Sequence, residues 1–124
     1  MDWSRQQVMD AAWEAAKWQF PDGFTLSDFK LSVADWDLWP VEVGHELAGA
    51  IMVKGAEMHC CIKPEFFRRW ATKALWRKVM RHKIRHGMLT TSVHVDHDAG
   101  RDFVERFGFR CIGNQNHILM YELR

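Results

Sequence analysis

A polar cluster in the second half of the chain contains residue types that bind metals. His94, Asp96, His97 and Asp98 fall within one short stretch, and imidazole and carboxylate groups ligate zinc and manganese. His94 and Asp96 are two residues apart on a predicted strand and would share one face, whereas Asp98 is placed to cap the helix that follows. Because no cysteine and histidine spacing of a closed zinc site accompanies them, the sequence predicts no metal.

The three cysteines, Cys60, Cys61 and Cys111, offer a second kind of chemistry. An odd number with an adjacent pair and no CxxC spacing is a poor disulfide framework, so we expect reduced thiols. On a strand, Cys60 and Cys61 point to opposite faces, and His59, the base that a nucleophilic Cys60 would need, points away from it. Both cysteines of the pair are therefore predicted to fill small apolar core positions.

Basic residues are concentrated in one stretch, although the formal net charge is only +1. The net charge is −6 over residues 1–59, +8 over residues 60–86 and −1 over residues 87–124. A four-residue interval drifts by roughly 40° per step on a helix, so basic residues at that interval form a winding ribbon. The ribbon fits a solvated helix face whose charge partly compensates the acidic first half of the chain. It also fits a surface that binds nucleic acid or another acidic partner. Its members are Arg69, Lys73, Arg77, Arg81 and Arg85.

Length and composition predict one folded domain over residues 1–124. The chain has 48% hydrophobic and 27% charged residues, ordinary globular values that argue against disorder, collagen and coiled coil. No apolar stretch approaches the roughly 18 residues of a membrane span, and the N-terminus has no apolar region of a signal peptide. We therefore expect a cytoplasmic protein that does not enter a membrane.

The apolar periodicity, with its caps and turns, predicts the elements that position these residues. Ser4 can cap the first helix and Thr25 or Ser27 a second, and Pro64 can open a long helix that Gly87 stops. A hairpin meander followed by a strand–helix–strand crossover indicates an α/β (α+β) fold, a mixed central sheet flanked by helices. The predicted helices span residues 4–19, 25–33, 65–84 and 99–107, and the strands begin near Leu38 and continue at 47–54, 58–62, 88–95, 109–113 and 117–123.

Three local stretches in this order resemble the GNAT superfamily of N-acetyltransferases. The resemblance covers about residues 36–124 and implies a GNAT-like mixed sheet, shortened at the N-terminus because the family's first strand has no counterpart. It also implies acetyl-CoA as the co-substrate. The stretches are Ile62-Lys63-Pro64-Glu65-Phe66, then Ala74-Leu75, and finally Phe103-Val104-Glu105-Arg106-Phe107-Gly108-Phe109.

The resemblance implies where acetyl-CoA would bind. In the family, pantetheine pairs with the backbone of the strand before the long helix, which here holds Cys60, Cys61 and Ile62. The pyrophosphate sits on amides at the start of that helix, an anion site because of its unpaired N–H groups and dipole. His97 and Phe103 are the expected CoA contacts near the last helix, and part of the basic ribbon can meet the CoA phosphates. The pyrophosphate stretch contains Phe67, Arg68, Arg69, Trp70, Ala71, Thr72 and Lys73.

The sequence departs from the family pattern at several of these positions. The family's loop motif is Arg/Gln-x-x-Gly-x-Gly/Ala, where this chain has Phe67, Trp70 and Thr72 at the three defined positions. Glycines there let the backbone approach phosphate closely. The usual Asn before the last helix is His97, and the usual Tyr, a general acid for the CoA thiolate, is Val104.

The resemblance also implies catalytic residues. A carboxylate or histidine near the start of the fourth family strand takes a proton from the amine, directly or through water, which indicates Glu57 or His59. Glu57 also fits an exposed turn residue, and His59 a core imidazole. Tyr121, the only tyrosine, lies on the last predicted strand and would replace the missing general acid.

Two functions remain open on the sequence. The resemblance implies an acetyl-CoA-dependent N-acetyltransferase, an acyltransferase acting on an amine that the residues do not identify. The alternative is a catalytically inactive GNAT-fold module that binds nucleic acid or protein through the basic helix. Small GNAT-like chains of this kind are similar to bacteriophage proteins, which implies host cytoplasm or virion as the location.

Overall fold

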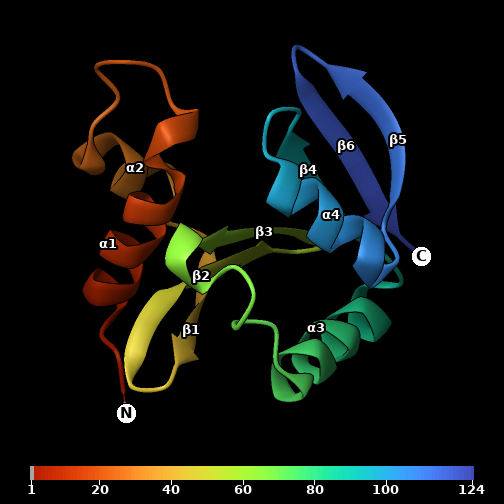
Figure 1. Ribbon diagram of the computed structural model, residues 1–124, viewed down its shortest axis with the longest axis horizontal. Coiled ribbons are helices and arrows are strands. Elements are labelled where there is room, and N and C mark those ends of the chain that lie inside the picture. Colours follow the sequence, from red (N-terminus) through yellow and green to blue (C-terminus); the bar gives the residue numbers. More distant parts are fainter. Residues whose placement is uncertain (1) are drawn as a thin grey trace. The chain divides into compact units, whose positions relative to one another are not determined.

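The structure, a computed structural model, describes residues 2–124 and has a mixed sheet with helices (Figure 1). The six strands follow the order β1-β2-β3-β4-β6-β5, and β3 pairs with β4 in parallel. This confirms the predicted fold class, and no strand precedes α1 within residues 2–124. The elements are α1 (Arg5–Ala16), η1 (Lys17–Gln19), α2 (Leu26–Ser32), β1 (Asp37–Val43), β2 (Glu46–Lys54), β3 (Glu57–Ile62), η2 (Pro64–Phe66), α3 (Lys73–His86), β4 (Leu89–His94), α4 (Asp98–Phe107), β5 (Arg110–Gln115) and β6 (Ile118–Leu123).

The chain forms two compact units, and β3 contributes to both of them. The first unit consists of residues 2–54 and Cys60–Ala71, and the second of Gly55–His59 and Thr72–Arg124. In the described residues, no helix combines the length and the apolar character that crossing a membrane requires.

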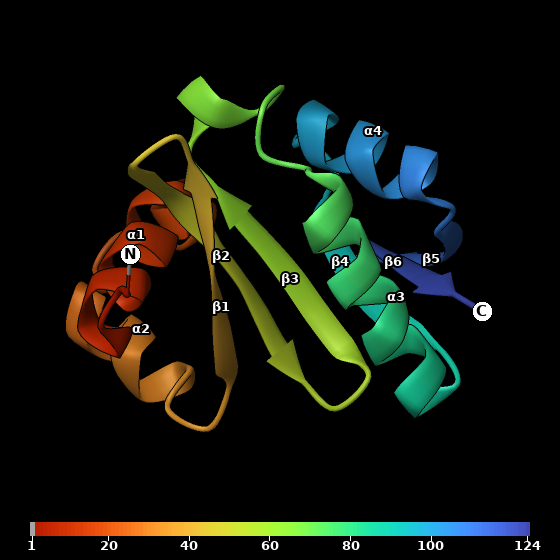
Figure 2. The same ribbon diagram turned by 90° about the horizontal axis from the view of Figure 1, so that it is seen from below.

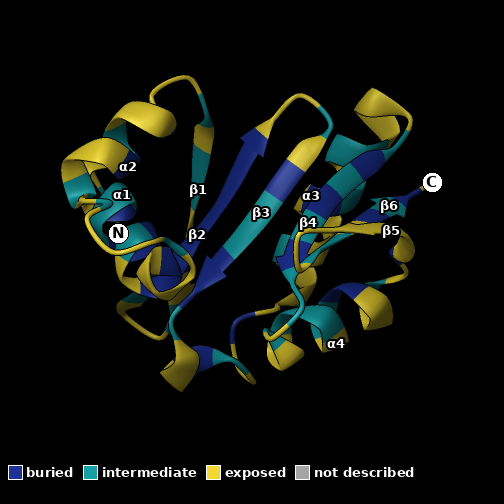
Figure 3. Ribbon diagram, turned by 90° about the horizontal axis from the view of Figure 1, so that it is seen from above, coloured by how far each residue is buried: buried dark blue, intermediate teal, exposed yellow. Residues whose placement is uncertain are grey.

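The core of the first unit lies between α1, α2 and β2. Ser4 caps α1 by accepting from the backbone N–H of Gln7, as the sequence predicts. Ala12 and Ala50 are fully buried there together with Phe29, and small side chains on the buried face let a helix approach a strand closely. Strand β2 is buried from Ala48 to Val53, as its dark-blue ribbon shows (Figure 3), which confirms the prediction of a strand covered on both faces.

The edge strand β1 contains a proline, Pro40. Pro40 is opposite Ala50 of β2, and the register shifts between Val41 and Glu42. Proline lacks a backbone donor and is therefore tolerated at a sheet edge or a bulge. Pro40 thus lies on an edge strand and close to an irregularity in the register, where it removes no hydrogen bond of a central strand.

The second unit has α3 and α4 on one face of β4 and β6 (Figure 2). Thr91 of β4 is opposite Tyr121 of β6, and Tyr121 reaches α4 through its hydroxyl. Trp76 of α3 lies 6.3 Å from Phe107 of α4, centroid to centroid. The two helices therefore share the face that Tyr121 presents.

The long helix begins later than the sequence predicts. Residues 65–72 are not part of it: Pro64–Phe66 form the short helix η2, and α3 starts at Lys73 with Thr72 as its N-cap. The Thr72 hydroxyl accepts from the backbone N–H of Leu75 at 3.2 Å. Proline in a first helical position suits a single 3₁₀ turn as well as an α-helix. Pro64 therefore does begin a helix, but that helix is the short η2 and not α3.

This shift removes Arg69 from the predicted helical ribbon. Its guanidinium lies 5.2 Å from the centroid of the Phe66 ring and donates to the carbonyl oxygen of Glu65 at 3.2 Å. At the other end, Gly87 has φ 81° and ends α3, as predicted, because glycine adopts the left-handed conformation without strain.

Two smaller predictions are also wrong by a few residues. Asp98 is the first residue of α4 rather than its cap; His97 holds the N-cap position, and its side chain does not cap the helix. The last turn falls at Asn116 and His117, which both have positive φ, and β5 runs on to Gln115. Positive φ at both central residues suits a two-residue hairpin turn, so strand pairing extends further than the polar composition indicated.

We predict that Gly49→Ala destabilises the first unit by at least about 3 kcal/mol. Gly49 has φ 152°, and a Cβ there would lie 1.9 Å from the carbonyl oxygen of Cys61. Gly44→Ala is the matched control, because Gly44 also has positive φ but no atom near the added Cβ; its cost should be about 1–2 kcal/mol. Urea denaturation measures both, and equal losses would contradict the close approach of the two backbones.

Candidate active site

A carboxylate and an imidazole meet at the start of β3. Glu57 and His59 are two residues apart on the strand, so their side chains share a face. The His59 Nε2 atom lies 2.7 Å from the Glu57 Oε2 atom. The His59 side chain is 22% exposed, so it is partly withdrawn from solvent but reachable. The structure thus brings together the two residues that the sequence offered as alternative bases.

The contact with Glu57 indicates which tautomer the His59 ring adopts. An ionised carboxylate only accepts hydrogen bonds, so Nε2 carries the proton in this contact. The neutral ring then has its lone pair on Nδ1. A pair of this kind orients an imidazole and stabilises its charged form after it takes up a proton.

The pairing of β3 with β4 is short in the second unit. Glu57 is opposite Thr90, and the Thr90 N–H donates to the carbonyl oxygen of Ala56 at 2.8 Å. Within Gly55–His59 this is the only residue of β3 with a partner in β4. The parallel ladder therefore ends before His59.

In the first unit, β3 continues through the residues that the resemblance assigns to pantetheine. Cys61 and Ile62 are buried, and Cys60 is partly buried. Burial raises the pKa of both thiols to about 12, with the neighbouring Cys61 adding to the effect at Cys60. Both therefore stay protonated at neutral pH and are not nucleophiles. Cys61 lies in the core as predicted, whereas Cys60 is only partly buried.

The loop from Phe67 to Thr72, which the resemblance assigns to the pyrophosphate, contains none of the family's glycines. Trp70 is only 5% exposed, so its ring points inward, and no residue from Phe67 to Thr72 has positive φ. Left-handed backbone is therefore not needed here. Phe67 is partly buried, whereas Arg68, Arg69 and Ala71 are exposed.

The N-terminus of α3 lies in the second unit and offers backbone donors. The first N–H groups of a helix have no intrahelical partner, and Thr72 satisfies that of Leu75 through its hydroxyl. The N–H groups of Lys73 and Ala74 remain as donors of the first turn. Lys73 is exposed, so a cation stands beside them.

His97 is fitted to a glycine one turn into α4. A Cβ on Gly100 would lie 2.5 Å from the His97 Nδ1 atom, so the imidazole occupies the space that any other residue at 100 would fill. Burial lowers the pKa of His97, while Asp98 raises it and His94 lowers it further by smaller amounts. The ring is therefore neutral at pH 7. Gly100 was not singled out from the sequence, since only the fold places it against His97.

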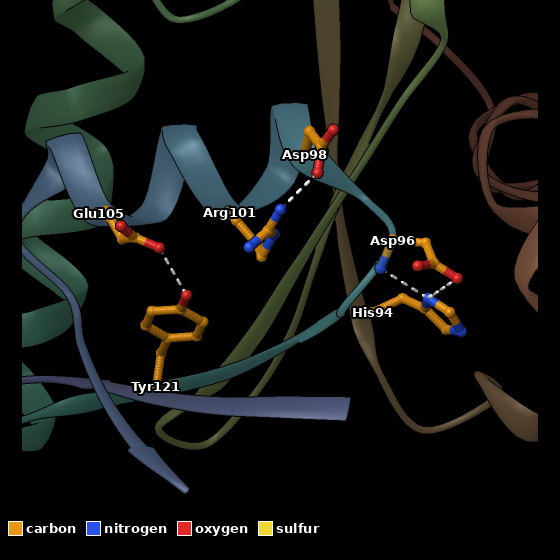
Figure 4. A network of polar contacts seen from close by, with 6 residues as sticks. All are labelled: His94, Asp96, Asp98, Arg101, Glu105 and Tyr121. Carbon is orange, nitrogen blue, oxygen red and sulfur yellow. Dashed lines mark hydrogen bonds and ion pairs between the residues drawn. The ribbon is translucent and has the colours of Figure 1, made fainter. Parts of the chain in front are cut away.

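The polar cluster after β4 is arranged as separate local pairs (Figure 4). The His94 Nδ1 atom accepts from the backbone N–H of Asp96 at 3.1 Å and lies 3.8 Å from its carboxylate. Asp98 pairs with Arg101 of the next helical turn. Among residues 2–124, no three His, Cys, Asp or Glu side chains are grouped to hold a metal ion.

Tyr121 is held beside α4 by a residue that the sequence analysis did not select. Its hydroxyl donates to the Glu105 Oε2 atom at 2.7 Å, as Figure 4 shows, and Tyr121 is only 2% exposed. Burial and the bond to Glu105 raise its pKa to about 12. Val104, where the family has its tyrosine, is buried, and Phe103 packs 5.8 Å from Phe107. A buried tyrosine predicts an acceptor, but the sequence does not say which one.

The sequence-predicted site residues divide between the two units. Cys60, Cys61, Ile62 and the loop from Phe67 to Ala71 belong to the first unit, and the remaining candidates belong to the second. The structure joins Glu57 to His59 but places Tyr121 with Glu105. The candidates of the second unit are Glu57, His59, Thr72, Lys73, His97, Phe103 and Tyr121.

The strand order, the short parallel pairing of β3 with β4 and the helix that connects them define the fold of the GNAT acetyltransferases. The chain is similar to PaiA N-acetyltransferase from Thermoplasma acidophilum in complex with coenzyme A, with a TM-score of 0.65 and 15% identity over 94% of this chain and 90% of that chain. It is also similar to a GNAT-family acetyltransferase from Listeria monocytogenes 4b F2365, with a TM-score of 0.58 and 14% identity over 95% of this chain and 87% of that chain.

These matches extend the resemblance beyond residues 36–124 into the N-terminal helices, since they cover at least 94% of the chain. No family model matches the sequence, and no curated protein is similar to it. The fold is thus that of the GNAT superfamily.

The buried position of His97 predicts a specific acid sensitivity. Above the ordinary histidine pKa of about 6.5, both folded and unfolded chains hold the ring neutral. As the pH falls below that value, the unfolded chain takes up a proton that the folded chain resists, so the free energy of unfolding decreases until the lowered folded pKa is passed. We predict a smaller decrease between pH 7 and pH 5 in His97→Asn, measured by urea denaturation. Equal decreases in the two proteins would contradict the assignment.

The Tyr121 contact predicts a coupled loss of stability. Tyr121→Phe should lower the free energy of unfolding by about 1 kcal/mol, because the ring still packs while one hydrogen bond is lost. Glu105→Ala removes the same bond, so the double variant should be less destabilised than the sum of the single ones by a similar amount. Additive losses would show that the bond contributes nothing in solution.

Proposed function

We propose that this protein is an N-acetyltransferase that moves the acetyl group of acetyl-CoA to a primary amine. The observation that carries the proposal is the contact of 2.7 Å between His59 and Glu57 at the start of β3. It supplies a base where the resemblance expects one, within a fold whose solved examples include an acetyltransferase in complex with coenzyme A.

The proposed reaction is direct attack of the amine on the thioester. The amine nitrogen forms a bond to the acetyl carbon, the carbon–sulfur bond breaks, and the CoA thiolate leaves. Backbone N–H groups of β3 would polarise the carbonyl oxygen as charge develops on it. His59 takes the proton that the amine loses, directly or through water, and Glu57 stabilises the imidazolium that results.

The proposed contacts of the co-substrate follow the resemblance and are given segment by segment. The backbone of Cys60–Ile62 would pair with pantetheine. The loop from Phe67 to Ala71 and the first turn of α3, with Thr72 and Lys73, would hold the pyrophosphate through backbone N–H groups and charge. The inward position of Trp70, only 5% exposed, supports this, because a bulky side chain at the position of a family glycine does not project into the loop.

His97, Phe103 and Tyr121 have narrower roles in the proposal. His97, neutral at pH 7 because burial lowers its pKa, is proposed as a hydrogen-bond partner of CoA, and Phe103 as an apolar contact. That Tyr121 donates a proton to the leaving thiolate stays a prediction. In the structure the Tyr121 hydroxyl already donates its hydrogen bond to Glu105.

Binding of acetyl-CoA is the first test. A ligand at 100 times its dissociation constant adds about 2.7 kcal/mol to the free energy of unfolding. We expect millimolar acetyl-CoA to raise the melting temperature, and desulfo-CoA without an acetyl group to do the same if the pyrophosphate and pantetheine sites are built as proposed. No shift with either compound would refute the enzyme and leave the inactive GNAT-fold module, whether bacteriophage-encoded or not.

Transfer is tested with His59→Gln, which keeps a hydrogen-bond donor toward Glu57 but removes the base. With spermidine or a lysine peptide as acceptor, acetylated product measured by mass spectrometry should form 10²- to 10⁴-fold more slowly. The melting shift with acetyl-CoA should be unchanged. His45→Gln is the matched control, because His45 is exposed in the turn between β1 and β2. Full activity of His59→Gln would exclude His59 as the base.

A further inference from the structure

The outward side of α3 is a uniformly cationic surface. No Asp or Glu occurs between Glu65 and Asp96, and Val79 is the only buried residue of the helix. At about 100° per residue, four of its basic residues fall within an arc of roughly 120° opposite Val79. They are Lys73, Arg77, Arg81 and Arg85, and all four are exposed; together they are the α3 cationic face.

No carboxylate of the described residues neutralises this face. None of its four members forms an ion pair within residues 2–124, whereas cations elsewhere are paired, such as Lys17 with Glu14, Arg106 with Asp102 and Arg124 with Glu122. Within the second unit, the charge of this face is therefore not neutralised. Four adjacent unpaired cations repel one another and favour a polyanionic partner.

We propose that the α3 cationic face binds the phosphate backbone of double-stranded nucleic acid, independently of base sequence. The face spans about 18 Å at 1.5 Å per residue, and an α-helix of about 10–12 Å diameter fits the major groove of B-form DNA, which is about 12 Å wide; the narrow major groove of an RNA duplex does not admit it. The helix contains no Asn, Gln, Ser or Thr, and these side chains usually supplement arginine in reading base edges. Phosphate contacts alone give binding without sequence preference.

Two features favour a duplex over the other polyanions. Binding to single strands relies on aromatic side chains that stack on bases. No aromatic side chain falls within the arc of the α3 cationic face, because Trp76, which is half exposed, lies outside that arc and packs against Phe107. An acidic protein would need an apolar centre in the interface, and within residues 73–86 this face has only one large exposed apolar side chain, Ile84.

The test is fluorescence anisotropy with a labelled 20-base-pair DNA duplex, an RNA duplex and a single strand of equal length. Four phosphate contacts predict that the logarithm of the binding constant falls with the logarithm of salt concentration at a slope of about −3.6, or about 150-fold between 50 and 200 mM. The triple variant Arg77→Ala, Arg81→Ala and Arg85→Ala should bring the slope to about −0.9. Alanine is the best helix former, and circular dichroism checks that α3 persists.

A second triple variant controls for net charge. Lys17→Ala, Arg106→Ala and Arg124→Ala remove the same charge from exposed cations that are already paired, and this protein should keep the wild-type slope. Since Lys73 is left in place, both triple variants should keep the melting shift with acetyl-CoA. A failure of the nucleic-acid proposal is therefore distinguishable from a failure of the proposed acetyltransferase function. Absence of duplex binding at 50 mM salt, equal loss in both variants, tighter binding to the single strand, or equal competition by polyglutamate would overturn it.

Discussion

The close approach of β2 and β3 is the constraint on which the proposed active site depends. Gly49 leaves room for the carbonyl oxygen of Cys61, which any Cβ at that position would overlap at 1.9 Å, and Lys63 donates its N–H to Ala48 at 2.9 Å. The backbone of β3 is therefore fixed against a strand that is buried on both faces. Its first residues carry Glu57 and His59, and its last lead into the loop that is proposed to hold phosphate.

Two kinds of positive charge serve different purposes in this account. At the start of α3, the exposed Lys73 belongs to the helical turn that we propose as a pyrophosphate contact. Further along, the arginines lie on a helix that buries only Val79, where charge contributes little to folding. A net charge of +1 conceals both groups, because acidic residues elsewhere in the chain balance the sum.

Most of the fold was predictable because local signals agreed with the tertiary packing. Ser4, Gly87 and the apolar run of β2 each predicted the right element, and the motif ending in Gly108-Phe109 indicated the fold that the solved GNAT structures share. The start of α3 was missed since Pro64 suits any helical first turn, whereas the actual cap, Thr72, lies eight residues further along the chain. The roles of Glu105 and Gly100 could not be predicted from the sequence. They depend on contacts with Tyr121 and His97, and only the fold brings these residues together.

The central claim is that acetyl-CoA lies along β3 and the first turn of α3, and amide hydrogen exchange tests it most directly. We predict that saturating acetyl-CoA slows exchange at Cys60–Ile62 and at Lys73 and Ala74, while amides of α1, such as that of Ala12, exchange as before. Unchanged exchange at both β3 and α3, with acetyl-CoA present in millimolar excess, would contradict the account.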